Sequence, residues 1–271
     1  MDKPSPNRVK HSMTRRELVQ IGGAALGVAG VGSLVHISLA QRASRSSPPG
    51  RMAMLIDLRK CFGCQACSVA CKSENGVLLG NFRTWVGQSY KGKYPRVRRH
   101  FLPRMCNHCE KPACVKVCPV GASYKRADGT VLIDKNICIG CRYCMSACPY
   151  GVRSFAWKRL PDQEVAYPSQ TLGVVDKCDL CVHRLDKGLV PSCVNTCPAG
   201  ARVVGNLNDP DSEISRIMAD QPVQTLAPEL GTQPNVYYIG LDQDAAEASL
   251  ESGVRMIPAQ ATNVTDRLGS E

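Results

Sequence analysis

Short apolar runs separated by polar or glycine-rich turns set the pattern of this chain from residue 52 onward. Residues 52–58 form the first run and predict a strand, because a short apolar stretch between polar segments is typical of a buried strand. Residues 130–134 repeat the pattern after an Asp-Gly turn, and residues 174–175 are a weaker equivalent. Three more runs, GASYK, GVRSFAW and GARVVG, each begin at a glycine. The pattern predicts many short strands rather than a few long elements.

The chain has sixteen cysteines, which fall between these runs in four groups of four. The groups are Cys61, Cys64, Cys67 and Cys71; Cys106, Cys109, Cys114 and Cys118; Cys138, Cys141, Cys144 and Cys148; and Cys178, Cys181, Cys193 and Cys197. The repeated order of strand, cysteine loop, helix and strand is that of half a bacterial ferredoxin. It predicts an α+β fold of two loop-rich ferredoxin-like subdomains, each with two [4Fe–4S] clusters.

The cysteine spacing has a physical reason. The third group reads C-x2-C-x2-C-x3-C-P, the ligand run of bacterial [4Fe–4S] ferredoxins. Three thiolates two residues apart let one tight loop hold three corners of a cubane, and the fourth cysteine reaches the other cluster of a pair. Proline follows the fourth cysteine at Pro119, Pro149 and Pro198, where it fixes φ and needs no N–H partner. Lys72 takes this place in group one, so we expect a different backbone there.

Disulfides and zinc are the alternatives for so many cysteines. Regular C-x-x-C triplets in 271 residues do not resemble a small disulfide-stapled scaffold. Zinc is usually held by two well-separated C-x-x-C pairs, and the triplets of groups one and three depart from that spacing. Sixteen thiolates can hold four cubanes. No Ser-His-Asp set, phosphate loop or carboxylate pair stands out, so the chain is expected to carry electrons without catalysing a reaction itself.

The beginning of the chain reads as an export signal. Residues 14–20 are TRRELVQ, and an apolar, Gly- and Ala-rich stretch runs from residue 18 to residue 40. A twin-arginine pair before such a stretch predicts a cleavable signal over residues 1–40, with cleavage after Ala40; an uncleaved membrane anchor is the alternative. Thiolate clusters must be built where thiols stay reduced. Export of an already folded protein by the twin-arginine route, to the periplasmic side of the cytoplasmic membrane, agrees with that need.

The net charge does not alter this interpretation. The whole chain carries +11, and without residues 1–40 it carries +8. Each oxidised cubane with four thiolates contributes about −2, so four clusters leave the loaded protein near neutral. The basic pI therefore does not indicate nucleic-acid binding. Arg96, Arg98 and Arg99 form a local basic patch, which we interpret as a solvated loop rather than a docking site.

The cysteine groups suggest how the chain is divided. A linker covers residues 41–51, and residues 52–100 hold the first half of an outer subdomain plus an insertion from residue 72. Residues 101–157 form a compact inner subdomain around groups two and three. Residues 158–207 hold a crossover and the second half of the outer subdomain. A C-terminal extension, residues 208–271, contains a predicted helix near 211–219 and a predicted strand at 235–240.

Several segments resemble the four-cluster iron–sulfur subunits of molybdopterin oxidoreductases. They are AMLIDLRKCFGCQAC, PRMCNHCEKPACVKVCPVGAS, CIGCRYCMSACPYGVR and DKCDLCVHRLDKGLVPSCVNTCPAGAR, and the resemblance covers roughly residues 52–240. Within the family the chain most resembles the tetrathionate reductase branch. It is also similar to the polysulfide and dimethyl sulfoxide reductase branches and, in GNLNDPDSEIS, to the iron–sulfur protein of quinol-linked nitrite reduction. Every ligand cysteine is present, so the resemblance implies four [4Fe–4S] clusters.

The resemblance also implies which cysteines share a cluster. Each ligand set joins three cysteines of one group to the last cysteine of another. Set 1 is Cys61, Cys64, Cys67 and Cys197; set 2 is Cys106, Cys109, Cys114 and Cys148; set 3 is Cys138, Cys141, Cys144 and Cys118; and set 4 is Cys178, Cys181, Cys193 and Cys71. The implied partners are a molybdopterin catalytic subunit and a membrane subunit that oxidises quinol, in anaerobic respiration. A relay for a nitrite reductase or a hydrogenase, and more remotely a zinc-binding interaction protein, are the alternatives.

Three other residues near the cysteines could have special roles. His108 and His183 lie within or beside C-x-x-C pairs and could ligate iron, but with all cysteines present we expect hydrogen-bonding or surface roles. Trp157 could assist electron tunnelling, but we expect ordinary packing.

Overall fold

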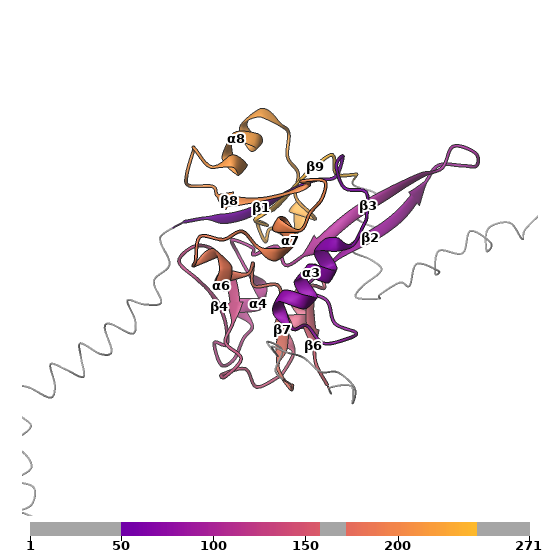
Figure 1. The fold of residues 1–271 in the computed structure, drawn as a ribbon. Coiled ribbons are helices and arrows are strands. Elements are labelled where there is room, and N and C mark those ends of the chain that lie inside the picture. Colours follow the sequence, from indigo (N-terminus) through magenta and orange to yellow (C-terminus); the bar gives the residue numbers. More distant parts are fainter. Residues whose placement is uncertain (1–49, 158–171, 243–271) are drawn as a thin grey trace, which may run out of the picture. The chain divides into compact units, whose positions relative to one another are not determined.

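The structure is a computed structural model that describes residues 50–157 and 172–242, which belong to one unit of the chain (Figure 1). The predicted signal at residues 1–40 lies outside the described residues. So do most of the predicted linker, residues 158–171 of the predicted crossover, and the C-terminal extension from residue 243. In the part that is described, no helix is long and apolar enough to cross a bilayer.

A three-stranded sheet brings together both ends of the described chain. The strand β1 (Met52–Asp57) lies in its centre and pairs antiparallel with β8 (Arg202–Asn206) and parallel with β9 (Val236–Ile239). The apolar runs before group one and after group four therefore form neighbouring strands, as the ferredoxin pattern predicts. The strand predicted at residues 235–240 is also present.

The central strand is apolar from Met52 to Ile56 because it is covered on both faces. Met54 and Ile56 point into the larger core, which also contains several of the cysteines. Ala53 and Leu55 point to the other side, where Ile214 of α8 (Glu213–Asp220) packs on them. Ser212 caps this helix by accepting a hydrogen bond from the Ser215 N–H. The predicted helix near 211–219 is thus confirmed, and it closes the outer face of the sheet.

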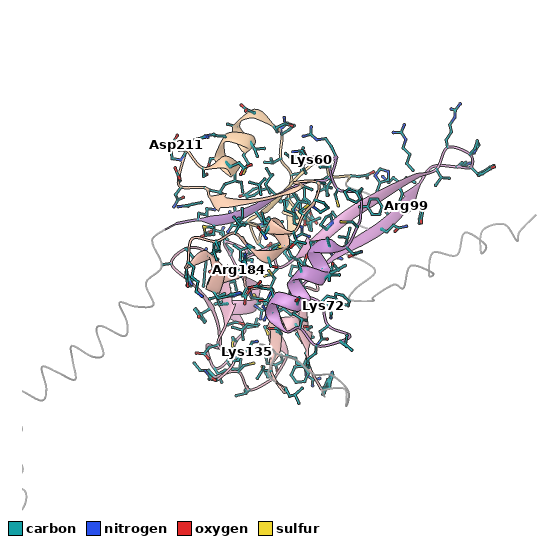
Figure 2. The ribbon with its side chains drawn as sticks, in the orientation of Figure 1. Lys60, Lys72, Arg99, Lys135, Arg184 and Asp211 are labelled. Atoms are coloured by element: carbon teal, nitrogen blue, oxygen red, sulfur yellow. The ribbon has the colours of Figure 1, made fainter. Side chains whose placement is uncertain are left out.

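A long β-hairpin was not predicted from the sequence. It consists of β2 (Thr84–Lys91) and β3 (Arg98–Met105), which pair antiparallel along their whole length (Figure 1). The three arginines interpreted as a solvated loop lie at its far end, where Figure 2 shows Arg99 directed away from the core. They are exposed, as expected, but Arg98 and Arg99 belong to a strand rather than a loop.

Two further antiparallel pairs connect successive cysteine groups. The pair β4 (Ser123–Lys125) and β5 (Val131–Ile133) joins group two to group three, and β6 (Arg153–Phe155) with β7 (Val175–Lys177) joins group three to group four. Three of these strands lie within predicted apolar runs, and β7 overlaps the weak run at residues 174–175 only at Val175.

The helices next to the cysteines are short, and proline accounts for their length. They are α4 (Ala113–Lys116), α5 (Tyr143–Ser146), α6 (Val182–Leu185) and α7 (Ser192–Asn195). Three of them end just before a Cys-Pro step, since the residue before proline is disfavoured in the helical conformation. Where Lys72 replaces proline, α3 (Ala66–Asn75) instead continues past Cys71. A short 3₁₀ turn, η1 (Pro228–Leu230), completes the elements of the described residues.

The architecture confirms the predicted fold class. Short strands and helices alternate around cysteine loops in a mixed, loop-rich arrangement. The exact subdomain boundaries stay a prediction.

Candidate iron–sulfur centres

All sixteen cysteines lie in the described part of the chain, and all are free thiols. In each group the residue before the second cysteine has the left-handed backbone conformation, with φ of 77° at Gly63, 42° at His108, 70° at Gly140 and 56° at Leu180. This shared conformation curls each loop so that its sulfur atoms turn inward. Among the described residues, no three thiols, imidazoles or carboxylates come close enough to hold a single metal ion.

Gly63 has a second reason to be glycine. A Cβ added there would lie 2.2 Å from a ring carbon of Phe101 on β3, far inside van der Waals contact. The hairpin therefore presses directly on the first cysteine loop.

We expect Gly63→Ala to destabilise this loop more than its backbone conformation alone would. An alanine with positive φ costs roughly 1–2 kcal/mol, and the clash with Phe101 adds to that. The matched control is Gly80→Ala, because Gly80 has φ of 83° but open space around a Cβ. Thermal midpoints and iron content would be compared. Equal losses in the two variants would contradict the packing argument.

The cysteines of set 1 surround one cavity. It is lined by Cys61, Cys64, Cys67 and Cys197 together with apolar groups, among them Val86, Pro103 and Pro198. Three of these thiols come from group one and the fourth from group four. A concave, mostly apolar space with four converging thiols fits a [4Fe–4S] cluster.

The cysteines of set 4 form a fully buried cluster of thiols. Burial raises the pKa of Cys71, and the neighbouring thiols Cys193 and Cys181 raise it further. Burial also raises the pKa of Cys178, and the neighbouring thiols Cys71 and Cys193 add to the rise. The side-chain amide of Asn75, at the end of α3, lies 3.7 Å from the Cys71 Sγ and 3.9 Å from the Cys181 Sγ. It can donate to both sulfur atoms.

The cysteines of set 2 are also neighbours. Burial raises the pKa of Cys109 to about 12, and Cys106, Cys114 and Cys148 contribute to the rise. The positive charge of bound iron would offset such repulsion, so that the coordinating thiols are deprotonated.

In set 3, burial raises the pKa of Cys144, and the neighbouring thiols Cys138 and Cys118 add to the rise. The pKa of Cys118 is lowered, in contrast to the raised pKa of Cys109 and Cys144. Burial acts to raise it, but backbone hydrogen bonds from the N–H groups of residues 120–123 outweigh burial. The Ser123 N–H, for example, lies 3.4 Å from the Cys118 Sγ. Ala201 makes the same contact with Cys197 in the outer unit, again at 3.4 Å. N–H groups aimed at sulfur are what a thiolate ligand requires.

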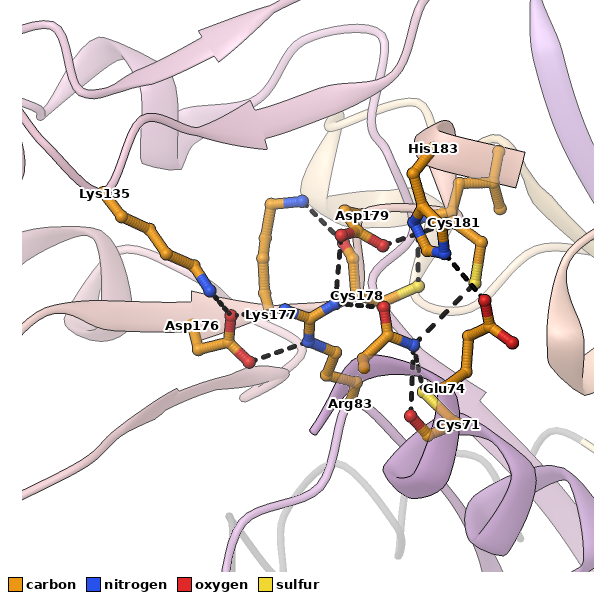
Figure 3. A network of polar contacts seen from close by, with 12 residues as sticks. Cys71, Glu74, Arg83, Lys135, Asp176, Lys177, Cys178, Asp179, Cys181 and His183 are labelled. Carbon is orange, nitrogen blue, oxygen red and sulfur yellow. Dashed lines mark hydrogen bonds and ion pairs between the residues drawn. The ribbon is translucent and has the colours of Figure 1, made fainter. Parts of the chain in front are cut away.

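A buried ion network holds the loop of group four to α3 and the hairpin (Figure 3). Arg83 donates to both carboxylate oxygens of Asp176 at 2.8 Å, to Asp179 at 3.0 Å and to the Asn75 side chain at 2.8 Å. Burial lowers the pKa of Arg83, but these carboxylates more than compensate and keep it charged. Because Asn75 also contacts two sulfur atoms, the network positions thiols of set 4.

The two histidines have hydrogen-bonding roles, as expected. His108 is buried and its Nδ1 accepts a hydrogen bond from the Val131 N–H at 3.0 Å. His183 lies at the surface, with its Nε2 2.9 Å from Glu74. Trp157 contradicts the expectation of ordinary packing: it is 71% exposed, with Phe155 at its edge and the Arg142 guanidinium over its ring.

The site was then compared with known proteins. Residues 97–207 match the family model described as "4Fe-4S dicluster domain". A tetrathionate reductase subunit of Salmonella typhimurium is 42% identical over 240 residues, which cover 85% of this chain and 89% of that protein. This chain belongs to the iron–sulfur subunits of molybdopterin reductases.

Two more relatives support this assignment. A selenate reductase subunit of Mesobacillus selenatarsenatis is 43% identical, covering 69% of this chain and 70% of that protein. A putative dimethyl sulfoxide reductase iron–sulfur subunit of Halobacterium salinarum is 44% identical, covering 69% and 78%.

Membership in the iron–sulfur subunits of molybdopterin reductases confirms the predicted chemistry. The cofactors are [4Fe–4S] clusters, and sixteen cysteines provide for four of them. The chain is an electron-transfer subunit rather than a catalyst, and it belongs to a multisubunit complex with a catalytic partner. The zinc interpretation is therefore set aside.

Proposed function

We propose that this chain relays electrons between a membrane subunit that oxidises quinol and an exported molybdopterin catalytic subunit, in a reductase of the tetrathionate, polysulfide or dimethyl sulfoxide type. The observation that carries the proposal is how the thiols are exposed. One cysteine of set 1, Cys64, and one of set 3, Cys141, are exposed, whereas all of set 4 is buried. Set 2 has no exposed thiol either. Two accessible ends joined through less exposed thiols are what a relay between two partners requires.

The cysteine neighbourhoods support the ligand sets proposed for the four clusters. The cavity around set 1 includes Cys197 from group four, and Cys148 of group three is a neighbour of Cys109 in group two. Cys118 of group two is likewise a neighbour of Cys144 in group three. In each case the fourth ligand comes from the other group of a ferredoxin pair.

The same neighbourhoods support an order of the clusters along the relay. Arg202 has Cys67 of set 1 and Cys193 of set 4 around it. Cys178 of set 4 has Cys106 of set 2 as a charged neighbour. Arg153 has thiols of sets 2 and 3 around it. The proposed order is therefore set 1, set 4, set 2, set 3.

Each cluster, when bound, takes up and releases one electron. The protein contributes position and exclusion of water. Met105, Leu180 and Tyr150, whose hydroxyl lies 2.5 Å from that of Thr232, are buried in one core with thiols of sets 1, 2 and 4. Exposed apolar residues surround the accessible thiol at each end. Near Cys141 they are Ile139, Tyr143 and Trp157, and near Cys64 it is Phe62. These surfaces fit the docking of partner subunits.

We expect anaerobically purified protein to contain about sixteen irons and about sixteen acid-labile sulfides per chain, because four cubanes need four of each. Iron and sulfide analysis would be combined with absorbance near 400 nm. A content near half of this, or stoichiometric zinc, would contradict the four-cluster assignment.

The proposed location is the periplasmic side of the cytoplasmic membrane, reached by the twin-arginine route. Replacing both Arg15 and Arg16 with lysine is expected to leave the protein in the cytoplasm with its clusters intact, since the route depends on this pair. Fractionation with iron analysis of both compartments measures this. A single exposed change such as Arg216→Lys is the control and should leave export unaltered. Unchanged periplasmic amounts in the double variant would mean that another signal directs export.

A further inference from the structure

Two buried arginines occupy the same place in the two halves of the molecule. Each is the fifth residue after a cysteine in the sequence C-P-x-G-x-R: Arg153 after Cys148, and Arg202 after Cys197. Each also begins a strand, β6 and β8 respectively. Arg153 is 2% exposed and Arg202 is 4% exposed. The equivalent position after group two is Ser123, and group one has no such proline motif.

Arg202 lies between the thiols of set 1 and set 4. One terminal nitrogen, Nη2, is 3.4 Å from the Cys67 Sγ and 3.1 Å from the Thr84 hydroxyl. The other, Nη1, faces the sulfur atoms of Met105 at 3.6 Å and Met54 at 3.9 Å. On the other side, the same guanidinium lies beside Cys193 of set 4 and hydrogen-bonds to it.

Arg153 repeats this arrangement between set 2 and set 3. Its guanidinium lies beside Cys114 of set 2 and Cys144 of set 3, and it hydrogen-bonds to Cys144. Its Nη1 donates to the Ser123 hydroxyl at 2.9 Å, while its Nη2 is buried without a protein partner.

The two arginines thus face equivalent thiols. Cys67, Cys144, Cys193 and Cys114 are each the third cysteine of their own group. Within residues 50–157 and 172–242, no carboxylate forms an ion pair with Arg153 or Arg202, in contrast to Arg83. A buried guanidinium without a counter-charge is strongly destabilising. Thiolate-bound clusters, each carrying about −2 when oxidised, would supply that charge.

We propose that Arg153 and Arg202 are internal counter-charges, each shared by the two clusters of one ferredoxin-like unit, and that they set the reduction potentials of that pair. The proposal rests on the ligand sets given under Proposed function. One-electron reduction, with the electron supplied by the neighbouring carrier or partner, takes a cluster from about −2 to about −3. A fixed positive charge at the sulfur atoms stabilises the more negative state, and so raises the potential of both neighbours.

Two features distinguish this role from a merely structural one. Arginine stays protonated at every pH used for proteins, so its effect on the potentials is independent of pH. Its effect is also local, because it falls with distance from the guanidinium. Each arginine should therefore act on its own pair of clusters and leave the other pair unchanged.

The test uses the full chain with its clusters and a redox titration followed by electron paramagnetic resonance. In Arg202→Gln the two outer clusters, on sets 1 and 4, should shift to lower potential while the inner two keep theirs. Arg153→Gln should shift the two inner clusters instead. Each shift should be the same at pH 6 and pH 8. Arg216→Gln, at an exposed position on α8, is the control and should move no potential.

The conservative variants separate charge from shape. Arg202→Lys and Arg153→Lys keep the charge, so most of each shift should be recovered. If a glutamine variant loses iron, the lysine variant alone decides. An ammonium is a point charge that cannot face both thiols at once, so the cluster farther from it should keep a small residual shift and the nearer cluster none. Unaltered potentials in iron-replete variants, or equal shifts in all four clusters, would overturn the proposal. Iron content and the number of paramagnetic centres report separately on the ligand sets.

Discussion

Changing Cys148 to serine is expected to impair the cluster bound by Cys106, Cys109 and Cys114, although Cys148 belongs to the next cysteine group along the chain. The expectation follows from the crossed ligation of ferredoxin pairs, and from the neighbourhood of Cys148 and Cys109. If the chain relays electrons as proposed, electron flow from quinol to the catalytic subunit should fall to background, because carriers in series fail together when one is lost. Quinol-dependent turnover of the whole complex measures the loss.

Cys118→Ser is the matched variant. It should impair the complementary cluster, on Cys138, Cys141 and Cys144, and leave the first one intact. Electron paramagnetic resonance of the reduced proteins tells the two apart. If both variants altered the same signal, or each altered the cluster of its own sequence group, the crossed assignment would be wrong.

The second large effect is expected at Arg83. Replacing it with glutamine leaves Asp176 buried and without its bidentate partner, which costs roughly 3–5 kcal/mol in the free energy of unfolding. Arg216→Gln is the matched control, because its pair with Asp211 is exposed and such pairs contribute about 0–1 kcal/mol. Denaturant unfolding, followed by the loss of visible absorbance, compares the two.

A double variant separates charge from packing at this site. After Arg83→Gln, Asp176 keeps only Lys135, at 3.3 Å, as an ion-pair partner. Adding Asp176→Asn removes this poorly compensated buried carboxylate, so part of the lost stability should return. No recovery would mean that the shape of the network, rather than its charge balance, holds the group-four loop to α3.

The strands next to the cysteine groups could be predicted because their pattern is local. Residues 52–58 and 130–134 are apolar runs beside turns, and both became strands. The effect of Lys72 was also predictable, because proline ends a helix and lysine does not. Lys72 instead extends α3 and donates to the carbonyl groups of Leu78 and Asn81.

The hairpin β2–β3 could not be predicted in the same way. Its second strand, RRHFLPRM, begins with three basic residues and contains Pro103, which weaken a strand signal. The strand is stabilised by tertiary contacts instead. Phe101 packs on Gly63, and the Tyr238 hydroxyl donates to the Pro103 carbonyl at 3.0 Å.

At the site, the sequence identified the ligands but not their surroundings. Cysteine spacing directly indicates a cluster, whereas the sequence does not distinguish a buried arginine from an exposed one. The motif C-P-x-G-x-R occurs twice and could have indicated Arg153 and Arg202. Nothing local indicates that Asn75 and Arg83, on either side of a turn, meet Asp176 in the fold.

The pairing of β1 with β8 and β9 has a consequence for biosynthesis. The inner pairs β4–β5 and β6–β7 join strands that leave the ribosome close together in time. In contrast, β1 meets its partners only after almost all of the described chain has been translated. The thiols of Cys61, Cys64 and Cys67, which are the first to be made, meet Cys197 in their cavity among the last. With the proposed ligand sets, the cluster at this end can be completed only after Cys197 has been made, later than the clusters on Cys106 and Cys138 and their partners.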